Sequence, residues 1–160
     1  MSRQETHLLF RLGGEPYSLP VQRVEEVLDY EEPTCIPRSP DYLLGVVNVR
    51  GRLIPVLNLR RRFGLPSTEM TTSSRFIVLN LSWGGETVPL GILVDAVEGV
   101  IDIDTDSISD PPGTADRGES DFLRGTVRCN DSIYLVLEVD RILTSDMLHN
   151  DFAAVSGGIA

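Results

Sequence analysis

The residue types that carry enzymatic chemistry are few in this sequence. The two histidines, His7 and His149, lie in terminal segments, and neither has a partner at the spacing of a known catalytic motif. The two cysteines, Cys35 and Cys129, are isolated; a disulfide is conceivable, but buried free thiols are the favoured prediction. No Gly-rich phosphate loop is present, and scattered His and Cys do not suit a zinc site. We therefore expect no enzymatic activity, no cofactor and no metal.

An alternating run of aspartates, Asp102, Asp104 and Asp106, resembles the beginning of a calcium-binding loop. The glycine and the terminal glutamate that such a loop needs are missing, and Ile108 and Asp110 follow instead. We interpret residues 102–121, which are acidic and rich in turn formers, as a solvated loop with at most one helical turn.

Arginine is the residue type whose placement is informative. All 14 basic residues are Arg, and several fall between residues 45 and 63 in an otherwise acidic chain: Arg50, Arg52, Arg60, Arg61 and Arg62. The run from Arg60 to Arg62 has two interpretations, which the sequence leaves open. It is either a solvated turn after a strand or an acid-seeking patch on an interaction surface.

The elements that position Arg50 and Arg52 form the organising stretch of the chain, residues 45–63. Two runs of β-branched and aliphatic residues, Val46–Val49 and Leu53–Leu59, predict strands. Gly51 between them accepts a positive φ, so the Arg50-Gly51-Arg52 step predicts a hairpin tip. The tip would project two guanidinium groups from a stiff apolar base, which suits recognition of a partner.

The same stretch occurs twice. Residues 45–63 align without a gap on residues 125–143, so that Gly45 corresponds to Gly125 and Val56 to Val136. Residues 16–29 likewise align on 89–102, and residues 8–12 on 77–81. Three blocks that recur in the same order indicate an internal duplication, and we expect residues 8–63 and 77–143 to superpose.

Short strands at close spacing, two matching halves and little helix predict a mainly β fold of two small β-barrel lobes that share one hydrophobic core. Further strands are expected at residues 8–12, 16–21, 25–30, 76–81, 88–94, 99–103, 126–129 and 133–139. We place lobe 1 at about residues 8–66 and lobe 2 at about 75–150, within one domain of residues 1–150. A short C-terminal helix should begin at Asp140, and residues 151–160 should form a flexible tail.

Composition restricts the partners. The net charge of −10 opposes nonspecific binding to nucleic acid and to anionic membranes. No apolar run is long enough to span a membrane, and the first residues lack the form of a signal peptide, so a cytoplasmic location is the default expectation.

The phrase from Leu44 to Arg60, LGVVNVRGRLIPVLNLR, resembles the signature of the CheW family of bacterial chemotaxis adaptors. The resemblance extends over nearly the whole chain. It implies two five-stranded SH3-like barrels on a common core and a noncatalytic scaffold. Such a scaffold joins the cytoplasmic tips of chemoreceptors to the regulatory domain of the histidine kinase CheA, and it is recruited to membrane-associated receptor arrays without entering the membrane.

The positions that match receptor-contact positions of the family are Val24, Glu26 and Arg50, with Gly51 shaping the turn. The resemblance assigns no kinase-contact residue. One departure is Asn58, where the family commonly has Asp, and this could remove a local ion pair. Positions at which the two halves agree, including Val24 with Val97 and Val27 with Val100, are interpreted as packing positions. Glu26 and Arg50 differ from their counterparts, which indicates specialisation.

The alternative hypothesis is a small β-barrel that binds nucleic acid through its arginines. The acidic net charge and the lack of aromatic residues among the arginines oppose it. The sequence does not decide which pathway (flagella, pili or another output), receptor or kinase would be served, or the oligomeric state.

Overall fold

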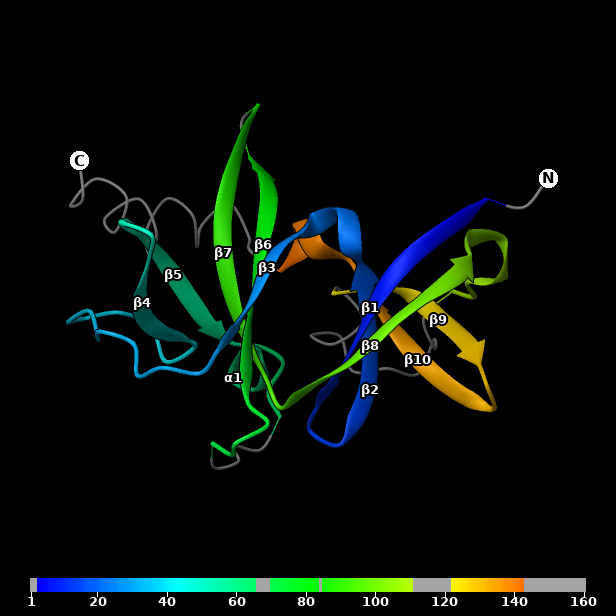
Figure 1. Ribbon diagram of the computed structural model, residues 1–160, viewed down its shortest axis with the longest axis horizontal. Coiled ribbons are helices and arrows are strands. Elements are labelled where there is room, and N and C mark those ends of the chain that lie inside the picture. The colour runs from blue at the N-terminus through cyan, green and yellow to red at the C-terminus, as the bar shows by residue number, and fades with distance from the viewer. Residues whose placement is uncertain (1–2, 66–69, 84, 111–121, 143–160) are drawn as a thin grey trace.

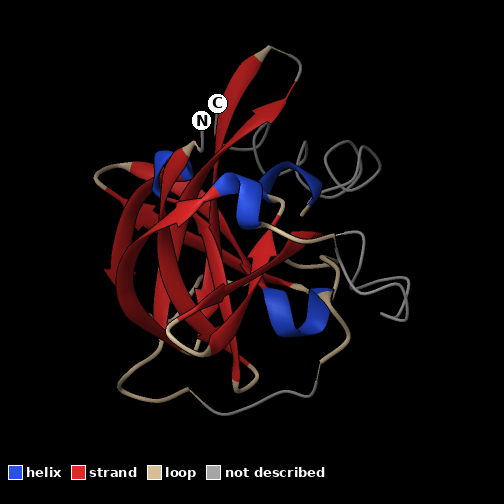
Figure 2. Ribbon diagram, turned by 90° about the vertical axis from the view of Figure 1, so that its right-hand side faces the viewer, coloured by secondary structure: helices blue, strands red, loops and turns tan. Residues whose placement is uncertain are grey.

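In the computed structural model the described residues are 3–65, 70–83, 85–110 and 122–142. They form mainly strands, with short helical turns between some of them (Figures 1 and 2). The strands are β1 (Gln4–Leu12), β2 (Glu15–Pro20), β3 (Val24–Asp29), β4 (Leu43–Val49), β5 (Arg52–Asn58), β6 (Arg75–Trp83), β7 (Glu86–Val94), β8 (Ala96–Asp104), β9 (Leu123–Cys129) and β10 (Ser132–Leu137). The helical elements are α1 (Leu59–Arg62) and the 3-10 turns η1 (Val21–Arg23), η2 (Thr105–Ser107) and η3 (Val139–Arg141).

The mainly β prediction is confirmed, and every strand expected from the sequence is present, several of them longer than expected. Strand β8 continues to Asp104, so the acidic loop begins later than residue 102. The predicted C-terminal helix is not confirmed: within the described chain η3 occupies residues 139–141, and residues 143–160 lie outside the described part.

The strands form two five-stranded sheets. The first, here called the β1 sheet, has the order β8-β1-β2-β10-β9, and the second, the β6 sheet, has the order β3-β6-β7-β5-β4. The two sheets lie next to each other along the long axis of the molecule, with η1 and η3 near the junction (Figure 1). Replacing each strand by its counterpart in the other repeat (β1 by β6, β2 by β7, and so on) converts one order into the other.

This topology corrects the expected boundaries of the lobes. Each sheet combines the first two strands of one repeat with the last three strands of the other. Contiguous lobes at about 8–66 and 75–150 are therefore wrong, because β3, β4 and β5 pair with β6 and β7 rather than with β1 and β2. The two repeats are interlocked, and each completes the sheet of the other.

The register of the sheets supports the duplication residue by residue. Gly45 pairs with Val56 in the β6 sheet, and Gly125 pairs with Val136 in the β1 sheet. The parallel contact of Val56 with Gly91 has its counterpart in Val136 with Ser18. The expected correspondence of Gly45 with Gly125 and of Val56 with Val136 is therefore confirmed at the level of strand pairing.

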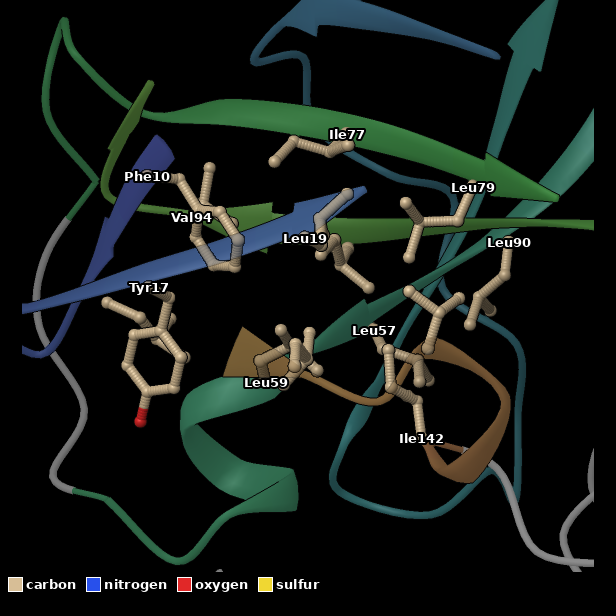
Figure 3. Close-up of a cluster of buried hydrophobic side chains, with 14 of the residues drawn as sticks. Phe10, Tyr17, Leu19, Leu57, Leu59, Ile77, Leu79, Leu90, Val94 and Ile142 are labelled. Atoms are coloured by element: carbon tan, nitrogen blue, oxygen red, sulfur yellow. The ribbon is translucent and has the colours of Figure 1, made fainter. Parts of the chain in front are cut away.

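One apolar cluster connects the two sheets. It contains side chains from β1 and β2 as well as from β4 to β7, and Leu19, Leu57 and Ile77 in it are fully buried (Figure 3). Complete burial of one such side chain stabilises the fold by about 1.5–3 kcal/mol. Because each small sheet alone could bury little apolar surface, the shared core is what stabilises both. The predicted common core is confirmed.

Each sheet also curves around an interior cluster of its own. The β6 sheet encloses a fully apolar set: Val47, Val49, Ile54, Val56, Phe76, Val78 and Leu93. The corresponding buried set of the β1 sheet is smaller: Ile103, Val127 and Val136. The two interior clusters therefore differ in size although their strands correspond.

Candidate partner-binding surface

The β4–β5 hairpin ends in the tight turn that the sequence predicts. Arg50 and Gly51 both have positive φ, at 53° and 85°, as a two-residue type I′ turn requires. The Gly51 N–H donates to Asn48 Oδ1 at 2.9 Å. The equivalent turn of the β9–β10 hairpin uses Asn130 and Asp131, also with positive φ. Asn and Asp adopt this conformation readily, whereas Arg does so at a cost in free energy.

The turn brings two of the predicted site residues together. Arg50 Nη2 lies 3.2 Å from Glu26 Oε1, and the side chain of Arg50 is 81% exposed while that of Glu26 is 22% exposed. A second pair, Arg52 with Glu25 at 2.8 Å, lies beside the first. Both acids belong to the edge strand β3 and both arginines to the β4–β5 hairpin, so the pairs connect β3 with the hairpin at the other end of the β6 sheet.

A bulge in β3 explains how adjacent glutamates both reach this hairpin. The register with β6 shifts between Val24 and Glu26, so Glu25 is the extra residue and both acids face the same region. The same shift occurs in β8, where Glu98 is the extra residue and pairs with Arg11 at 3.0 Å. The bulge is thus part of the duplicated design.

Next to the Arg50–Glu26 pair lies an open hollow of about 370 Å³, lined by Glu26, Leu28, Asp29, Glu31, Asn48, Val49 and Arg50. Its wall combines carboxylates, one guanidinium and two apolar side chains. Because Arg50 is mostly exposed, its ion pair with Glu26 contributes at most about 1 kcal/mol to stability, and a partner could exchange it at small cost.

Val24 has a different environment from the other predicted site residues. It opens β3 and is partly buried against the shared core, as its counterpart Val97 is. Three of the predicted site residues therefore lie together at the hollow and the hairpin tip: Glu26, Arg50 and Gly51. Val24 lies on the same strand as Glu26, but its side chain packs against the shared core.

Two apolar residues near this surface are exposed, which the sequence analysis did not predict. Val27 on β3 is 41% exposed and Leu53 on β5 is 39% exposed. Their counterparts in the β1 sheet, Val100 and Ile133, are 59% and 54% exposed. The interpretation of Val27 and Val100 as packing positions is therefore wrong. Agreement between the repeats was the available signal, but it does not distinguish a shared core position from a shared surface position.

Two of the three arginines that follow β5 are structural. Arg60 is only 7% exposed and forms an ion pair with Asp95. The guanidinium of Arg62 lies 4.4 Å from the ring centroid of Phe122, and it donates to the Ile142 carbonyl at 3.2 Å. For Arg60 and Arg62, both open interpretations of the run (a solvated turn or an acid-seeking patch) are thus wrong. The nucleic-acid hypothesis would need these two side chains to contact phosphates, but both are already engaged in contacts within the protein.

Asn58, the departure from the family pattern, caps the N-terminus of α1. Its side chain is nearly buried, and its Oδ1 accepts from the Arg61 N–H at 3.4 Å. Asn is a favourable residue at this capping position, so Asn58 keeps a local role without an ion pair.

The cysteines differ from expectation: both are free thiols, but Cys35 is exposed and Cys129 is half-buried.

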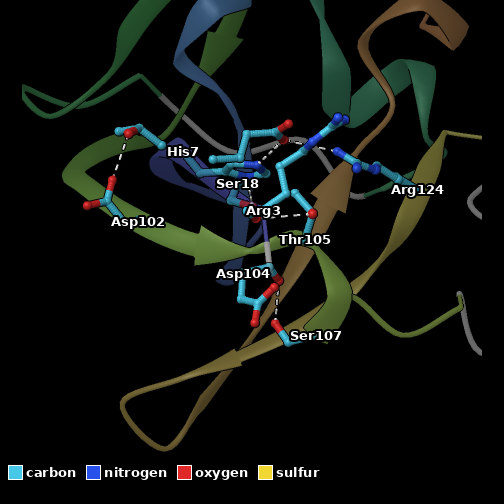
Figure 4. Close-up of polar contacts among 10 residues, drawn as sticks. Arg3, His7, Ser18, Asp102, Asp104, Thr105, Ser107 and Arg124 are labelled. Atoms are coloured by element: carbon cyan, nitrogen blue, oxygen red, sulfur yellow. Dashed lines mark hydrogen bonds and ion pairs between the residues drawn. The ribbon is translucent and has the colours of Figure 1, made fainter. Parts of the chain in front are cut away.

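A polar cluster in the interior of the β1 sheet was not foreseen (Figure 4). His7 Nδ1 lies 3.0 Å from Ser18 Oγ, and His7 Nε2 lies 2.7 Å from Glu5 Oε1. The order Ser-His-Glu matches a catalytic triad, and sequence spacing alone missed it because Ser18 lies on β2 while His7 and Glu5 lie on the paired strand β1. Both His7 and Ser18 are 0% exposed, however, so a substrate cannot contact this serine.

The pKa values of His7 and Glu5 are both lowered from their ordinary values. Burial lowers the pKa of His7, and the hydrogen bond and charge of Glu5 offset part of this effect. For Glu5, burial raises the pKa, but hydrogen bonds from His7 and Arg124 outweigh it and leave the pKa lowered. The cluster therefore favours a neutral imidazole and an ionised carboxylate.

The described part of the chain contains neither a metal-binding cluster nor a membrane-spanning helix. No three His, Cys, Asp or Glu side chains come together there in a group that could hold a metal ion. In the same part of the chain, no helix has both the length and the apolar character needed to cross a bilayer.

Comparison with known proteins agrees with this fold. Residues 6–147 match the family model described as CheW-like domain. The chain is similar to the chemotaxis protein CheW of Klebsiella aerogenes, with 30% identity over 139 residues that cover 87% of this chain and 81% of the relative. It is 29% identical over 143 residues to CheW of Treponema pallidum, covering 87% and 82%.

Among solved structures, the crystal structure of the scaffolding protein TtCheW from Thermoanaerobacter tengcongensis is similar. The TM-score is 0.77 at 31% sequence identity, and the match covers 89% of this chain and 92% of that one. The family match extends over far more than half of the sequence and includes strands of both sheets. This chain therefore belongs to the CheW-like family of chemotaxis adaptor domains.

Proposed function

We propose that the protein is a noncatalytic adaptor that couples the cytoplasmic tips of chemoreceptors to a CheA-type histidine kinase. The observation that carries the proposal is the family match over residues 6–147. The exposed Arg50–Glu26 pair at the hairpin tip supports it, because this pair differs between the two repeats and is held beside an open hollow. In this role the protein acts in the cytoplasm and is recruited to receptor arrays by protein contacts alone.

For the receptor arm we propose contacts at Glu26 and Arg50, with Gly51 setting the turn and Val24 holding the base of β3 on the core. A receptor tip is a helical hairpin, and one of its acidic side chains would replace Glu26 as the partner of Arg50, or a basic one would replace Arg50. The apolar side chains of Val27 and Leu53 would then supply the desolvated part of an interface.

For the kinase arm, the exposed apolar residues of the other sheet, Val100 and Ile133, have suitable chemistry for contact with a similar barrel. They lie on the β1 sheet, whereas the proposed receptor residues lie on the β6 sheet. An adaptor needs two separable surfaces, and the duplicated fold offers one on each sheet.

The test is charge reversal at the tip. Arg50→Glu removes no core contact, so the free energy of unfolding should change by about 0.5 kcal/mol or less. Receptor binding should weaken by about 2–5 kcal/mol, since two like charges would then meet at the interface. Receptor affinity and kinase activation would be measured in a reconstituted array of receptor, kinase and adaptor.

The matched control is Asn130→Glu at the equivalent tip of the β1 sheet. It should leave receptor affinity nearly unchanged, although it should cost some stability because Asn suits the positive φ at this position. If Arg50→Glu activates the kinase as well as the unmodified protein does, the receptor role of Arg50 is wrong. If neither receptor nor kinase binds the unmodified protein, the adaptor function itself is wrong.

A further inference from the structure

The polar cluster around His7 replaces apolar core residues of the duplicated unit. His7 corresponds to Phe76, Ser18 to Gly91 and Arg124 to Leu44. In the β6 sheet Phe76 is fully buried in the interior cluster, and Leu44 packs against it. Within the described residues, the β1 sheet therefore has a buried histidine at the position where the β6 sheet has a buried phenylalanine.

The cluster lies where the β1 sheet is most weakly joined. The β9–β10 hairpin is connected to β2 by a parallel ladder of two residue pairs, one of them Val136 with Ser18. Arg124 on β9 donates to Glu5 Oε1 at 3.0 Å and so adds a charged connection between this hairpin and β1. By contrast, β1 pairs with β8 over most of its length.

The hydrogen bonds determine the tautomer of His7. The ionised Glu5 carboxylate only accepts, so the Nε2–H of His7 donates to it. In the neutral ring Nδ1 is then an acceptor, and the Ser18 hydroxyl donates to it. The chain of donors and acceptors is complete in this state, with Arg124 donating to the same carboxylate oxygen.

A proton added at Nδ1 disturbs this arrangement in two ways. Nδ1–H must now donate to Ser18 Oγ, so the Ser18 hydroxyl loses its acceptor. In addition, a buried imidazolium and the Arg124 guanidinium then share one oxygen of Glu5, and the two cations repel each other. Opening of the hairpin would return His7 to water, where protonation carries no such penalty.

We propose that the His7–Glu5–Arg124 chain is a proton-sensitive latch that holds the β9–β10 hairpin on the β8-β1-β2 part of its sheet. When His7 is neutral the latch is closed. Protonation of His7 favours an open form in which β9 and β10 separate from β2. The β6 sheet, with Phe76 at the corresponding place, has no such response.

Within the described chain, the other side chains that surround His7 do not form a charged contact with its ring. From β8, Asp102 accepts from Thr6 Oγ1 at 2.6 Å, and Asp104 accepts from the Asp106 N–H at 2.9 Å. On β2 and β8 the residues paired with His7 are Pro20 and Ile101, which carry no charge. From β10 the side chain of Tyr134 packs against the interior cluster of this sheet. Glu5 and Arg124 are thus the ionised groups that act on His7.

The sign of the effect follows from proton linkage. The pKa of His7 is lowered in the closed form by burial and returns to its ordinary value, about 6.5, in the open form. The open form therefore binds more protons, and its population rises as the pH falls below about 6.5. At pH 5.5 the increase can reach about tenfold, which is the ratio set by one pH unit.

The test is hydrogen exchange of the full chain at pH 7.5 and pH 5.5, corrected for the intrinsic pH dependence of amide exchange. Protection of residues 123–137 should fall by up to about tenfold at the lower pH, while residues 43–58 of the equivalent hairpin should keep theirs. The double variant His7→Phe with Ser18→Gly, which copies the other sheet, should abolish the difference. Equal loss in both hairpins, or the same loss in the variant, would overturn the latch.

A second measurement leaves His7, Ser18, Glu5 and Arg124 unchanged. The imidazole of His7 is followed by NMR during an acid titration, with His149→Gln used to assign the two histidines. The midpoint for His7 should lie below about 6.5, and amides of β9 and β10 should shift with the same midpoint. A titrating His7 with no accompanying change in β9 and β10 would show that the histidine is an inert core residue.

Discussion

At the hairpin tip, Arg50 has a φ of 53°, a conformation that costs most non-glycine residues free energy. The equivalent tip uses Asn130, which adopts the same conformation readily. A residue that is kept in an unfavourable conformation while its exposed side chain contributes little to stability suits a role in binding rather than in folding.

We therefore predict that Arg50→Asn separates the two roles. The variant creates an Asn-Gly type I′ turn, which should raise the free energy of unfolding by up to about 1 kcal/mol, less whatever the exposed Glu26 pair contributes. Receptor affinity should fall. Denaturant unfolding and receptor titration measure the two effects, and a clear loss of stability would show that Arg50 is needed for the fold.

At the scale of single elements, the most restrictive positions are two corresponding glycines. A Cβ on Gly45 would lie 2.1 Å from the Thr34 carbonyl oxygen, and one on Gly125 would lie 2.1 Å from the Ser109 carbonyl oxygen. In each case a loop segment forms an isolated bridge with the strand, Thr34 with Val46 and Ser109 with Thr126. Glycine is required because the loop backbone crosses directly over the strand.

Gly45→Ala and Gly125→Ala should each reduce the free energy of unfolding by more than about 2 kcal/mol, because a backbone must move to admit the methyl group. The control is Gly85→Ala, where φ is +82° but no atom lies within 4 Å of the added Cβ. That variant should lose only about 1–2 kcal/mol from the unfavourable φ. Thermal or urea unfolding compares the three, and a Gly45→Ala protein as stable as Gly85→Ala would contradict the close approach.

At the scale of the whole molecule, interlocking of the repeats is the main feature. The ion pairs at the junction have opposite polarity in the two repeats. Arg60 of α1 pairs with Asp95 beside β8, whereas in the other half Asp140 of η3 pairs with Arg23 beside β3. The hydrogen bond from Arg23 lowers the pKa of Asp140, despite partial burial. This reversal of charge favours pairing between unlike repeats, since two copies of one repeat would place like charges together.

The topology predicts that neither repeat folds alone. A fragment of residues 1–65 contains β1 and β2 without the three strands that complete their sheet, and a two-stranded hairpin is at best marginally stable. Each separate fragment, 1–65 or 70–160, should lack a cooperative unfolding transition. An equimolar mixture should recover β-sheet circular dichroism and cooperative unfolding. Cooperative folding of either fragment on its own would contradict the exchange of strands.

The sequence by itself determined the local and repeated features of this protein. The strands, the Arg50-Gly51 tip, the mainly β class and the duplication follow from side-chain alternation, glycine placement and aligned blocks, which are visible along the chain. The family resemblance followed from the residues around the same tip.

Only the tertiary structure decided which repeat supplies which strands to each sheet. The prediction of two contiguous lobes was wrong on this point. Strand partners depend on long-range packing, and β2 pairs with β10 through contacts that local patterns do not encode. The same reason explains why Arg60 became a junction residue, why Val27 remained exposed, and why His7 met Ser18 and Glu5 in a buried cluster. Each of these outcomes depends on which distant strands surround a side chain. The free energy of burying that side chain is gained only when the sheets assemble.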